Sequence, residues 1–334
     1  MKQKIICFGE LLLRMSARPG EMLLQAPHLH ACIGGAEANV AVSLAHFGHD
    51  VSLVSALPAN ALGCAARDAV RAHGVDTQAI RFAPGRMGLY FLTPGAVLRP
   101  SEIIYDRAGS AFSLTDPAAY DWPALLEGAS WLHVSGVSPA VGEGAAQAVL
   151  AAMRAARAMG LQVAFDGNYR ASLWARQGKD GAHVLYQLMQ HADLAFADQR
   201  DFALLLGRPE LASGTRAGAM AASFDAFPNL ARIAATTRSQ VSHDRHDLGA
   251  TLHTRTGAIA ARVVELHNIV ERIGTGDAFA AGVLHGLLRG WTDARALDFA
   301  LAAAAVKHSI AGDFNLASEA QVEAACAGAL DVRR

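Results

Sequence analysis

The chain has 334 residues, of which 52% are hydrophobic and 18% charged, a composition that excludes a disordered protein. Its 29 Lys and Arg residues nearly balance its 30 Asp and Glu residues. This balance argues against a nucleic-acid-binding protein, because such proteins carry a basic excess.

Signals for export or membrane insertion are not found in the sequence. The first apolar run is broken at Gly9 and Glu10, too early for a signal peptide, and no run of about 18 apolar residues occurs. Four widely spaced cysteines form no CxxC pair: Cys7, Cys32, Cys64 and Cys326. They are expected to be free thiols, so we predict a cytoplasmic protein that contacts no membrane.

Apolar runs and helical patterns alternate from the N-terminus. The expected elements are strands over Lys4–Phe8, Leu11–Met15 and Val51–Ala56, and helices over Ala36–Phe47 and Leu62–His73. The first helix rests on Val40, Leu44 and Phe47, which recur at helical spacing. This β-α-β-α order is typical of a parallel sheet covered by helices.

The alternation of strands and helices is interrupted between Ile80 and Phe112. This region is rich in turn residues, namely Gly85, Gly88, Pro94, Gly95 and Pro100. Short runs over Gly88–Thr93 and Ile103–Tyr105 lie between them and predict hairpins instead of further βαβ units. We expect a small β-sheet beside the main one.

Alternation then resumes and continues to the C-terminal third. The expected strands are Trp131–Val134, Gln162–Asp166, Leu194–Ala197, Ile233–Thr237 and an edge strand over Gly249–Thr254; the expected helices are Gly144–Met159, Asp277–Leu288 and Ala294–Ile310. No internal repeat or linker interrupts this order. We therefore predict one α/β domain over residues 1–334, with a doubly wound, mostly parallel sheet and helices on both faces.

The strongest chemical signal is Gly274-Thr275-Gly276-Asp277. Two glycines allow a tight turn with exposed N–H groups, and the helix that follows directs its positive end to the same place. Such a turn suits a phosphate in transfer, and Asp277 there can take a proton from an attacking hydroxyl. An ordinary turn with Asp277 as a helix cap explains the motif alone about equally well.

Other glycine motifs do not match this turn. A Walker A loop needs a lysine after its glycines, and none follows here. A dinucleotide fingerprint needs a third glycine where Phe279 stands. Both of these glycine motifs are therefore excluded.

A second glycine turn, Gly34-Gly35-Ala36-Glu37-Ala38-Asn39, also begins a helix. In the first helical turn, the Asn39 amide can reach a ligand hydroxyl. A capped helix start is the simpler explanation of this turn taken alone.

Two arginines follow predicted strands. Arg107 lies at the end of the small sheet and Arg170 after the strand that ends at Asp166, on the side where open α/β sheets bind ligands. Arginine forks match carboxylates, so together they favour an acidic substrate. For either arginine alone, a surface ion pair is the simpler explanation.

Two further chemistries are weakly supported. The run His243-Asp244-Arg245-His246-Asp247 resembles a metal cluster, but its polarity favours a loop. A serine hydrolase would need a GxSxG motif, which is absent.

The two glycine turns together resemble the two signatures of PfkB-type (ribokinase-like) carbohydrate kinases. Within that family the chain is most similar to 2-keto-3-deoxygluconate kinases. Three stretches carry this second likeness: 105–112 (YDRAGSAF), 166–170 (DGNYR) and 307–314 (KHSIAGDF). The resemblance covers nearly the whole chain and implies a ribokinase-like fold with a small β-sheet lid from about residues 10–33 and 80–113.

The resemblance also implies roles for individual residues. Asp277 would be the catalytic base, with the amides of Gly274, Thr275 and Gly276 as the anion hole. The sugar-acid pocket would hold Gly34, Gly35, Ala36, Glu37, Ala38, Asn39, Tyr90, Tyr105, Asp106, Arg107, Arg170 and Asp313. ATP would meet Asn168, Asp198, Thr236, Arg238, Ser239, Gly274, Gly276 and Lys307. Magnesium would meet Asp198 and Asp201, and a monovalent cation is left open as a further cofactor.

Three positions depart from the family pattern. Glu271 stands where an aspartate is usual, and 198–201 (DQRD) replaces the usual Asn-x-x-Glu motif. A glycine-rich nucleotide turn is replaced by 236–239 (TTRS). These departures affect the metal and adenine contacts most, while Glu10 has no evident role.

The resulting hypothesis is ATP-dependent phosphorylation of 2-keto-3-deoxygluconate to its 6-phosphate. A fructokinase, or another neutral-sugar or nucleoside kinase of the same fold, is the alternative, and it would leave Arg107 and Arg170 without a carboxylate. A sugar-binding regulator without catalysis is a third hypothesis, which the presence of Asp277 argues against. The family likeness also predicts a homo-oligomer that pairs through the lid.

Overall fold

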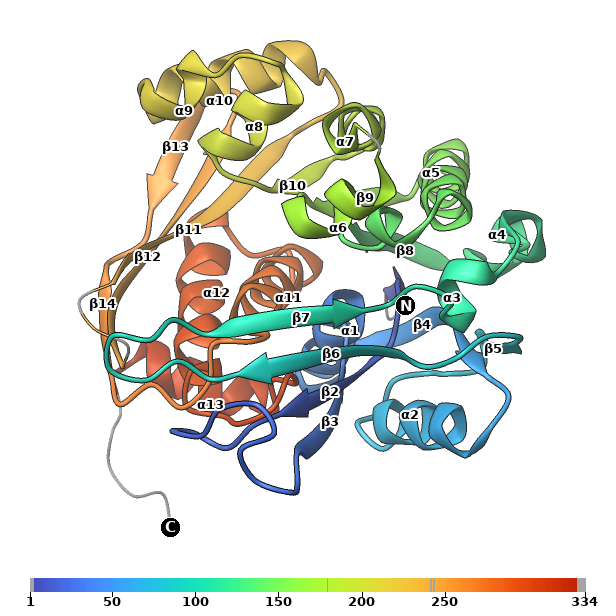
Figure 1. Ribbon diagram of the computed structural model, residues 1–334. Helices are drawn as coiled ribbons and strands as arrows, with labels where there is room; N and C mark the ends of the chain where they lie inside the picture. The colour runs from blue at the N-terminus through green and yellow to red at the C-terminus, as the bar shows by residue number, and fades with distance from the viewer. Residues whose placement is uncertain (1–2, 179, 241, 243, 329–334) are drawn as a thin grey trace.

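A ten-stranded sheet lies at the centre of the described part of the chain (residues 3–178, 180–240, 242 and 244–328) in this computed structural model (Figure 1). Nine strands follow one another in the order β13 (Gly257–Ala260), β12 (Arg245–Thr254), β11 (Arg232–Gln240), β10 (Leu194–Phe196), β9 (Gln162–Asp166), β8 (Ala129–Ser135), β1 (Lys4–Phe8), β4 (Asp50–Pro58) and β5 (Ile80–Ala83). The tenth, β14 (Val264–His267), pairs with β12. Neighbours from β11 to β5 run parallel, whereas β12 is antiparallel to β11.

Helices cover both faces of this sheet (Figure 1). They are α1 (Ala36–His46), α2 (Ala61–Arg71), α3 (Ala111–Leu114), α4 (Trp122–Leu125), α5 (Glu143–Ala158), α6 (Ala171–Gln177), α7 (Gly181–Met189), α8 (Gln199–Leu205), α9 (Glu210–Ser213), α10 (Arg216–Ala226), α11 (Thr275–Leu288), α12 (Asp293–Lys307) and α13 (Glu319–Cys326). Two single turns of 3₁₀-helix lie at Pro117–Ala119 and Pro139–Val141.

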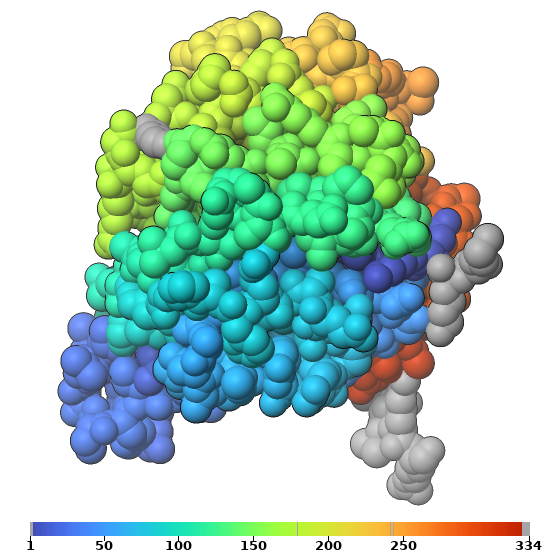
Figure 2. Space-filling view, turned by 90° about the vertical axis from the view of Figure 1, so that its right-hand side faces the viewer, coloured from blue at the N-terminus to red at the C-terminus, as the bar shows by residue number. Residues whose placement is uncertain are grey.

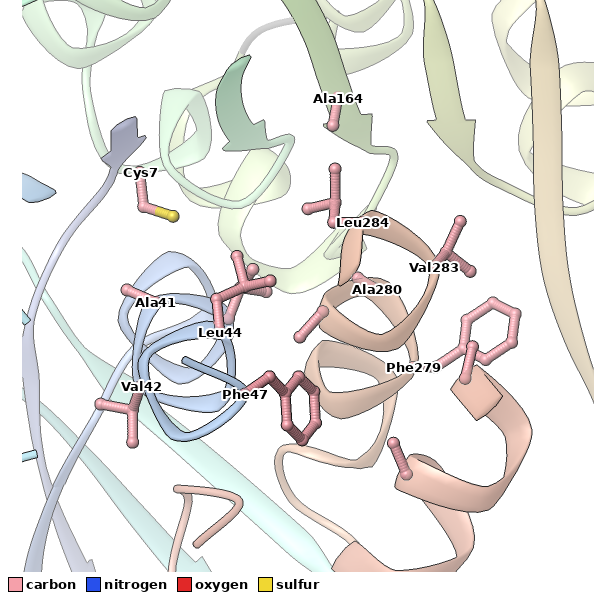
Figure 3. Packing of buried hydrophobic residues seen from close by; sticks show 14 of the residues in the cluster. Cys7, Ala41, Val42, Leu44, Phe47, Ala164, Phe279, Ala280, Val283 and Leu284 are labelled. Atoms are coloured by element: carbon pink, nitrogen blue, oxygen red, sulfur yellow. The ribbon is translucent and has the colours of Figure 1, made fainter. Parts of the chain in front are cut away.

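Alternation along the strands produces two hydrophobic cores, one on each face. In β1, Ile5 and Cys7 belong to the core with α1 and α11, and Ile6 and Phe8 to the core with α5 and α7. Figure 3 shows α1 and α11 side by side in the first of these cores. This packing fixes the starts of both helices relative to each other, which matters because each start follows a glycine turn.

A small four-stranded sheet stands beside the main sheet (Figure 1). Its order is β3 (His30–Gly34), β2 (Leu12–Ser16), β6 (Gly88–Thr93) and β7 (Glu102–Asp106), with β2 and β6 parallel and the other pairs antiparallel. Figure 2 shows the blue N-terminal part projecting at the lower left of the body, beside the teal segments. Exposed apolar side chains of the small sheet and its β6–β7 loop are Val97, Leu98, Ile103 and Ile104. Pairing of copies through this sheet stays a prediction.

The expected doubly wound sheet with helices on both faces and a separate small sheet is confirmed. Three local expectations are wrong. Ile80–Ala83 forms no hairpin, because it pairs in parallel with β4 and closes the edge of the main sheet. Gly249–Thr254 is not an edge, because β12 continues between β11 and the pair β13 and β14.

The third concerns the polar run after residue 242. Arg245–Asp247 is not a loop, because it begins β12 and pairs with β11 and β14. His243 lies outside the described residues. The four cysteines are free thiols, as expected. Among the described helices, none has the length and apolar character needed to cross a bilayer.

Candidate functional site

A cavity of about 440 Å³ opens at the carboxyl ends of the parallel strands, where open α/β sheets place their ligand sites. We call it the central cavity. Its walls come from the small sheet, the start of α1, the loop after β9 and the glycine turn before α11. Of the residues expected around a substrate, those lining it are Gly35, Ala36, Glu37, Asn39, Tyr90, Tyr105, Arg107, Arg170 and Asp313, together with Gly274, Thr275, Gly276 and Asp277.

The glycine turn before α11 is held in a conformation that only glycine adopts easily. Gly274 has a φ of +79°, and a Cβ there would lie 2.0 Å from the carbonyl oxygen of Asp313. No side chain of the described residues caps this end of α11, so its first N–H groups are left for a ligand. Gly274 therefore has the backbone conformation that the predicted anion hole requires, and the role of this turn stays a prediction.

Asp277 lies in the first turn of α11 and faces the central cavity. Burial raises the pKa of its carboxyl group to about 7, a hydrogen bond from Asn39 lowers it, and the charges of Glu37 and Asp313 raise it. The amide nitrogen of Asn39 donates to Asp277 Oδ2 at 2.7 Å. Asn39 thus positions Asp277, whereas the sequence predicts an amide that reaches a ligand hydroxyl.

Glu37 is buried beneath the cavity. Its Oε1 accepts hydrogen bonds from the backbone N–H of Ser135 at 3.0 Å, from the hydroxyl of Ser135 at 2.7 Å and from that of Ser138 at 2.8 Å. Burial raises its pKa despite these bonds. Glu37 therefore joins α1 to the end of β8, and its Oε1 is already engaged.

The two arginines differ in their surroundings. Arg107 is buried, and its Nε donates to Glu10 Oε2 at 2.6 Å. Arg170 is exposed to the cavity and has no ion pair within the described residues. Arg170 is therefore the freer of the two for an anionic ligand, while Glu10, which had no evident role, orients Arg107.

The neighbouring Asp106 does not reach the central cavity. Its carboxylate pairs with Arg86 on the half-exposed rim of the small sheet. The expectation that Asp106 contacts a substrate is therefore wrong in this arrangement, because alternation along β7 turns it away from Tyr105 and Arg107.

A buried ionic network closes one wall of the cavity. Arg14 Nη1 lies 3.0 Å from Asp313 Oδ1 and 2.9 Å from Glu271 Oε2, and the hydroxyl of Tyr90 donates to Asp313 Oδ2 at 2.6 Å. Burial would lower the pKa of Arg14, but the two carboxylates raise it well above its usual value. The network gives Glu271 a role as a partner of Arg14. Sequence patterns did not predict this network, because its one signal is a single charged residue within the apolar strand β2.

Gly34 leaves space for the Asp313 carboxylate and does not line the central cavity. A Cβ on Gly34 would lie 1.9 Å from Asp313 Oδ2, so only glycine leaves room for this carboxylate. Neither Gly34 nor Ala38 lines the central cavity, and Ala38 is buried in the core with α11. Their expected contacts with a substrate are replaced by packing roles.

Two further carboxylates crowd the cavity. Burial raises the pKa of Asp166 to about 8, and the charge of Asp277 raises it as well, while Arg170 lowers it. Burial also raises the pKa of Asp201 to about 6. The sequence drew attention to the loop after β9 but gave Asp166 no role of its own.

A second cavity of about 360 Å³, which we call the adjoining cavity, shares the glycine turn with the first. Its lining residues are Asp198, Arg200, Thr236, Arg238, Leu248, Thr275, Gly276, Ala304 and His308. Beyond the turn its walls are mostly polar, with Leu248 and Ala304 as the apolar exceptions. Asn168 lines the central cavity instead, and Ser239 lines neither.

Lys307 does not face either cavity. It is fully buried, and its Nζ donates to the carbonyl oxygens of Ile310 and Gly312, both at 2.8 Å. Burial lowers its pKa to about 8. The expectation that Lys307 contacts a nucleotide is wrong here, because the ammonium group holds the loop before Asp313.

The predicted magnesium ligands are engaged in a helix cap. Asp201 Oδ2 accepts from the backbone N–H of Asp198, and Asp198 accepts from the backbone N–H groups of Arg200 and Asp201. Asp198 also pairs with Arg200. Within the described residues, no three His, Cys, Asp or Glu side chains gather as metal ligands. The pair thus forms no metal site by itself.

Comparison with known proteins gives a consistent result. The model of the pfkB family of carbohydrate kinases matches residues 2–316. The 2-dehydro-3-deoxygalactonokinase of Haloferax volcanii is 30% identical over 325 residues, covering 97% of this chain and 96% of that protein.

Solved structures agree with this match. A PfkB family carbohydrate kinase from Listeria grayi superposes with a TM-score of 0.92 at 35% identity, covering 97% of this chain and 100% of that one. The 2-dehydro-3-deoxygluconokinase of Thermotoga maritima gives 0.90 at 34% identity, covering 98% and 99%. A fructokinase from Xylella fastidiosa with bound ATP gives 0.80 at 25% identity, covering 98% and 99%.

Proposed function

Because this chain belongs to the pfkB family of carbohydrate kinases, we propose that it transfers a phosphoryl group from ATP to a 2-keto-3-deoxy sugar acid. The best candidate substrate is 2-keto-3-deoxygluconate, which would be converted to its 6-phosphate. Relatives named for 2-dehydro-3-deoxy sugar acids support this class of substrate. The free arginine Arg170 in the same cavity as Asp277 is the observation that carries the proposal.

The central cavity would hold the sugar acid with its carboxylate at Arg170 and Arg107. The primary hydroxyl would lie at Asp277, which takes its proton as the hydroxyl oxygen attacks the γ-phosphorus. The bond from that phosphorus to the β,γ-bridging oxygen breaks, and ADP leaves. The N–H groups at the start of α11 would stabilise the charge on the transferred group.

ATP would occupy the adjoining cavity, with its phosphates at the turn shared by both cavities. Magnesium would arrive with the phosphates, because this ion is commonly bound by phosphate oxygens with one or two carboxylates. The ion would neutralise part of the negative charge on the phosphates. The side chains of the protein divide the remaining work, since Asp277 holds the proton, Asn39 orients Asp277, and Glu10 orients Arg107.

The neutral-sugar alternative predicts a different order of substrates. We expect ADP formation, measured by a coupled assay, to give a higher kcat/KM with 2-keto-3-deoxygluconate than with fructose. A higher value with fructose would establish the alternative function. Turnover of neither, with sugar binding retained, would favour the regulator.

Replacing Arg170 by Ala should separate acidic from neutral substrates. Loss of its charge-assisted hydrogen bonds should lower kcat/KM for the sugar acid about 10–100-fold. The weak reaction with fructose should hardly change, because a neutral sugar has no carboxylate for this fork. Arg208→Ala is a matched control, since Arg208 pairs with Glu210 at an exposed site. Equal losses for both substrates would assign Arg170 to the phosphates or to Asp277, whose pKa the charge of Arg170 lowers.

Activity should fall on the acid side of a pKa near 7, because Asp277 accepts a proton only when ionised. The hydrogen bond from Asn39 favours the ionised form, so Asn39→Leu should move this acid limb to higher pH. The measurement is the pH profile of kcat/KM for both proteins. An acid limb that stays in place would show that Asn39 does not act on the catalytic proton.

A further inference from the structure

The largest of the cavities described here, about 730 Å³, lies between the small sheet and the main sheet. We call it the lid cavity. The loop at residues 94–101 forms one side, and Arg238, Arg272 and Ile273 lie on the other. Arg272 also lines the central cavity, and Arg238 also lines the adjoining cavity. These two arginines therefore lie where the three cavities meet.

The charges of Arg238 and Arg272 are not balanced by the part of the chain that the structure describes. Within the described residues, no carboxylate forms an ion pair with Arg238 or Arg272, although Arg14 in the same cavity has two partners. Arg238 is exposed and Arg272 is half-buried. Both arginines line the lid cavity, so the two cations are near each other. Burial lowers the pKa of Arg272, and the charge of Arg238 lowers it further.

Two like charges near each other are unfavourable unless an anion lies between them. Arginine forks match phosphate oxygens, and two forks can bind different oxygens of one group. Only Ile273 separates Arg272 from the glycine turn, which places Arg272 beside the predicted anion hole. A phosphate at the turn thus lies within the region that both arginines border.

We propose that Arg238 and Arg272 together clamp the terminal phosphate of the nucleotide, so that the donor is held from the lid cavity as well as from the start of α11. This inference rests on the proposed function, because it takes the adjoining cavity as the nucleotide site. It adds a pair of side chains to a phosphate site that otherwise consists mainly of backbone amides. The clamp also implies discrimination between nucleoside triphosphates and monophosphates.

The test is calorimetric binding of three probes, each with magnesium: the non-hydrolysable ATP analogue AMPPNP, AMP, and 2-keto-3-deoxygluconate. We expect Arg238→Gln and Arg272→Gln each to weaken AMPPNP binding about tenfold or more, with AMP and sugar-acid binding unchanged. Arg18→Gln is the matched control, because Arg18 is exposed and lines the lid cavity from the small sheet. Its AMPPNP affinity should equal that of the parent protein.

The double variant tests whether one phosphate contacts both arginines. Two groups that bind the same anion are coupled, so the loss in the double variant should differ from the sum of the single losses. Additive losses would overturn the clamp, and so would unchanged AMPPNP binding. Loss of sugar-acid binding instead would assign Arg272 to the substrate. Because these readouts require no turnover, failure of the clamp is distinguishable from failure of the proposed kinase activity.

Discussion

Asp277→Asn should lower kcat about 10²–10⁴-fold while leaving the binding of nucleotide and sugar acid little changed. The amide has the shape of the carboxylate but accepts no proton from the attacking hydroxyl. Its oxygen can still accept the hydrogen bond from Asn39, so the first turn of α11 should keep its structure. Steady-state kinetics with calorimetric binding of both substrates measures the two effects separately.

The pH profile supplies a second readout for this variant. Any residual turnover should lose the acid limb near pH 7 that ionisation of Asp277 imposes on the parent. Near-normal kcat in Asp277→Asn would remove this residue from the proton transfer. Asp166, which also has a raised pKa and lines the central cavity, would then be the next base to test.

Arg14→Met should lower the free energy of unfolding by about 3–5 kcal/mol, because it leaves the buried Asp313 and Glu271 without their cation. Urea unfolding followed by circular dichroism measures this loss. Arg71→Met is the matched control: it breaks one ion pair, with Asp68, at an exposed site of α2. That change should cost about 1 kcal/mol or less.

The loss in Arg14→Met should shrink as the pH falls. Burial raises the pKa of Asp313, and the charge of Arg14 lowers it, so the pKa rises further when Arg14 is absent. A carboxyl group with a raised pKa in the folded state binds a proton more readily there than in the unfolded chain, which makes folding more favourable at lower pH. If the loss of unfolding free energy does not change with pH, lost packing would explain it, and an uncompensated charge would not.

Sequence patterns predicted the features of the site whose residues are close together in the chain. The site at Gly274 needs a positive φ, the start of a helix and an acidic residue in the first turn of that helix. These three features lie within the four consecutive residues 274–277. The alternation of strands and helices likewise predicted the main sheet, since each strand and helix has its own pattern. Consequently the glycine turns, Asp277 and both arginines could be assigned to one cavity from sequence patterns and the family resemblance.

Pairing across the chain could not be predicted in the same way. Arg107 and Glu10 are 97 positions apart, and nothing near either residue indicates the other. Lys307 has the type of side chain that binds phosphate, but the path of the following loop directs it onto backbone carbonyls. The prediction of a hairpin at Ile80 was wrong because turn residues near a strand do not show which strand it will pair with. Here the partner is β4.

The pairing of β2 with β6 has a consequence for the order in which the protein folds. Leu12 aligns with Gly88, so the small sheet joins two segments separated by β3, α1, β4, α2 and β5. Contacts between distant segments form late, because the loop between them must first be closed at a cost in entropy. Ordering β4, α2 and β5 against β1 shortens that loop to a compact unit. The small sheet should therefore assemble after this part of the main sheet, so a nascent chain acquires its scaffold before the strands that cover its central cavity.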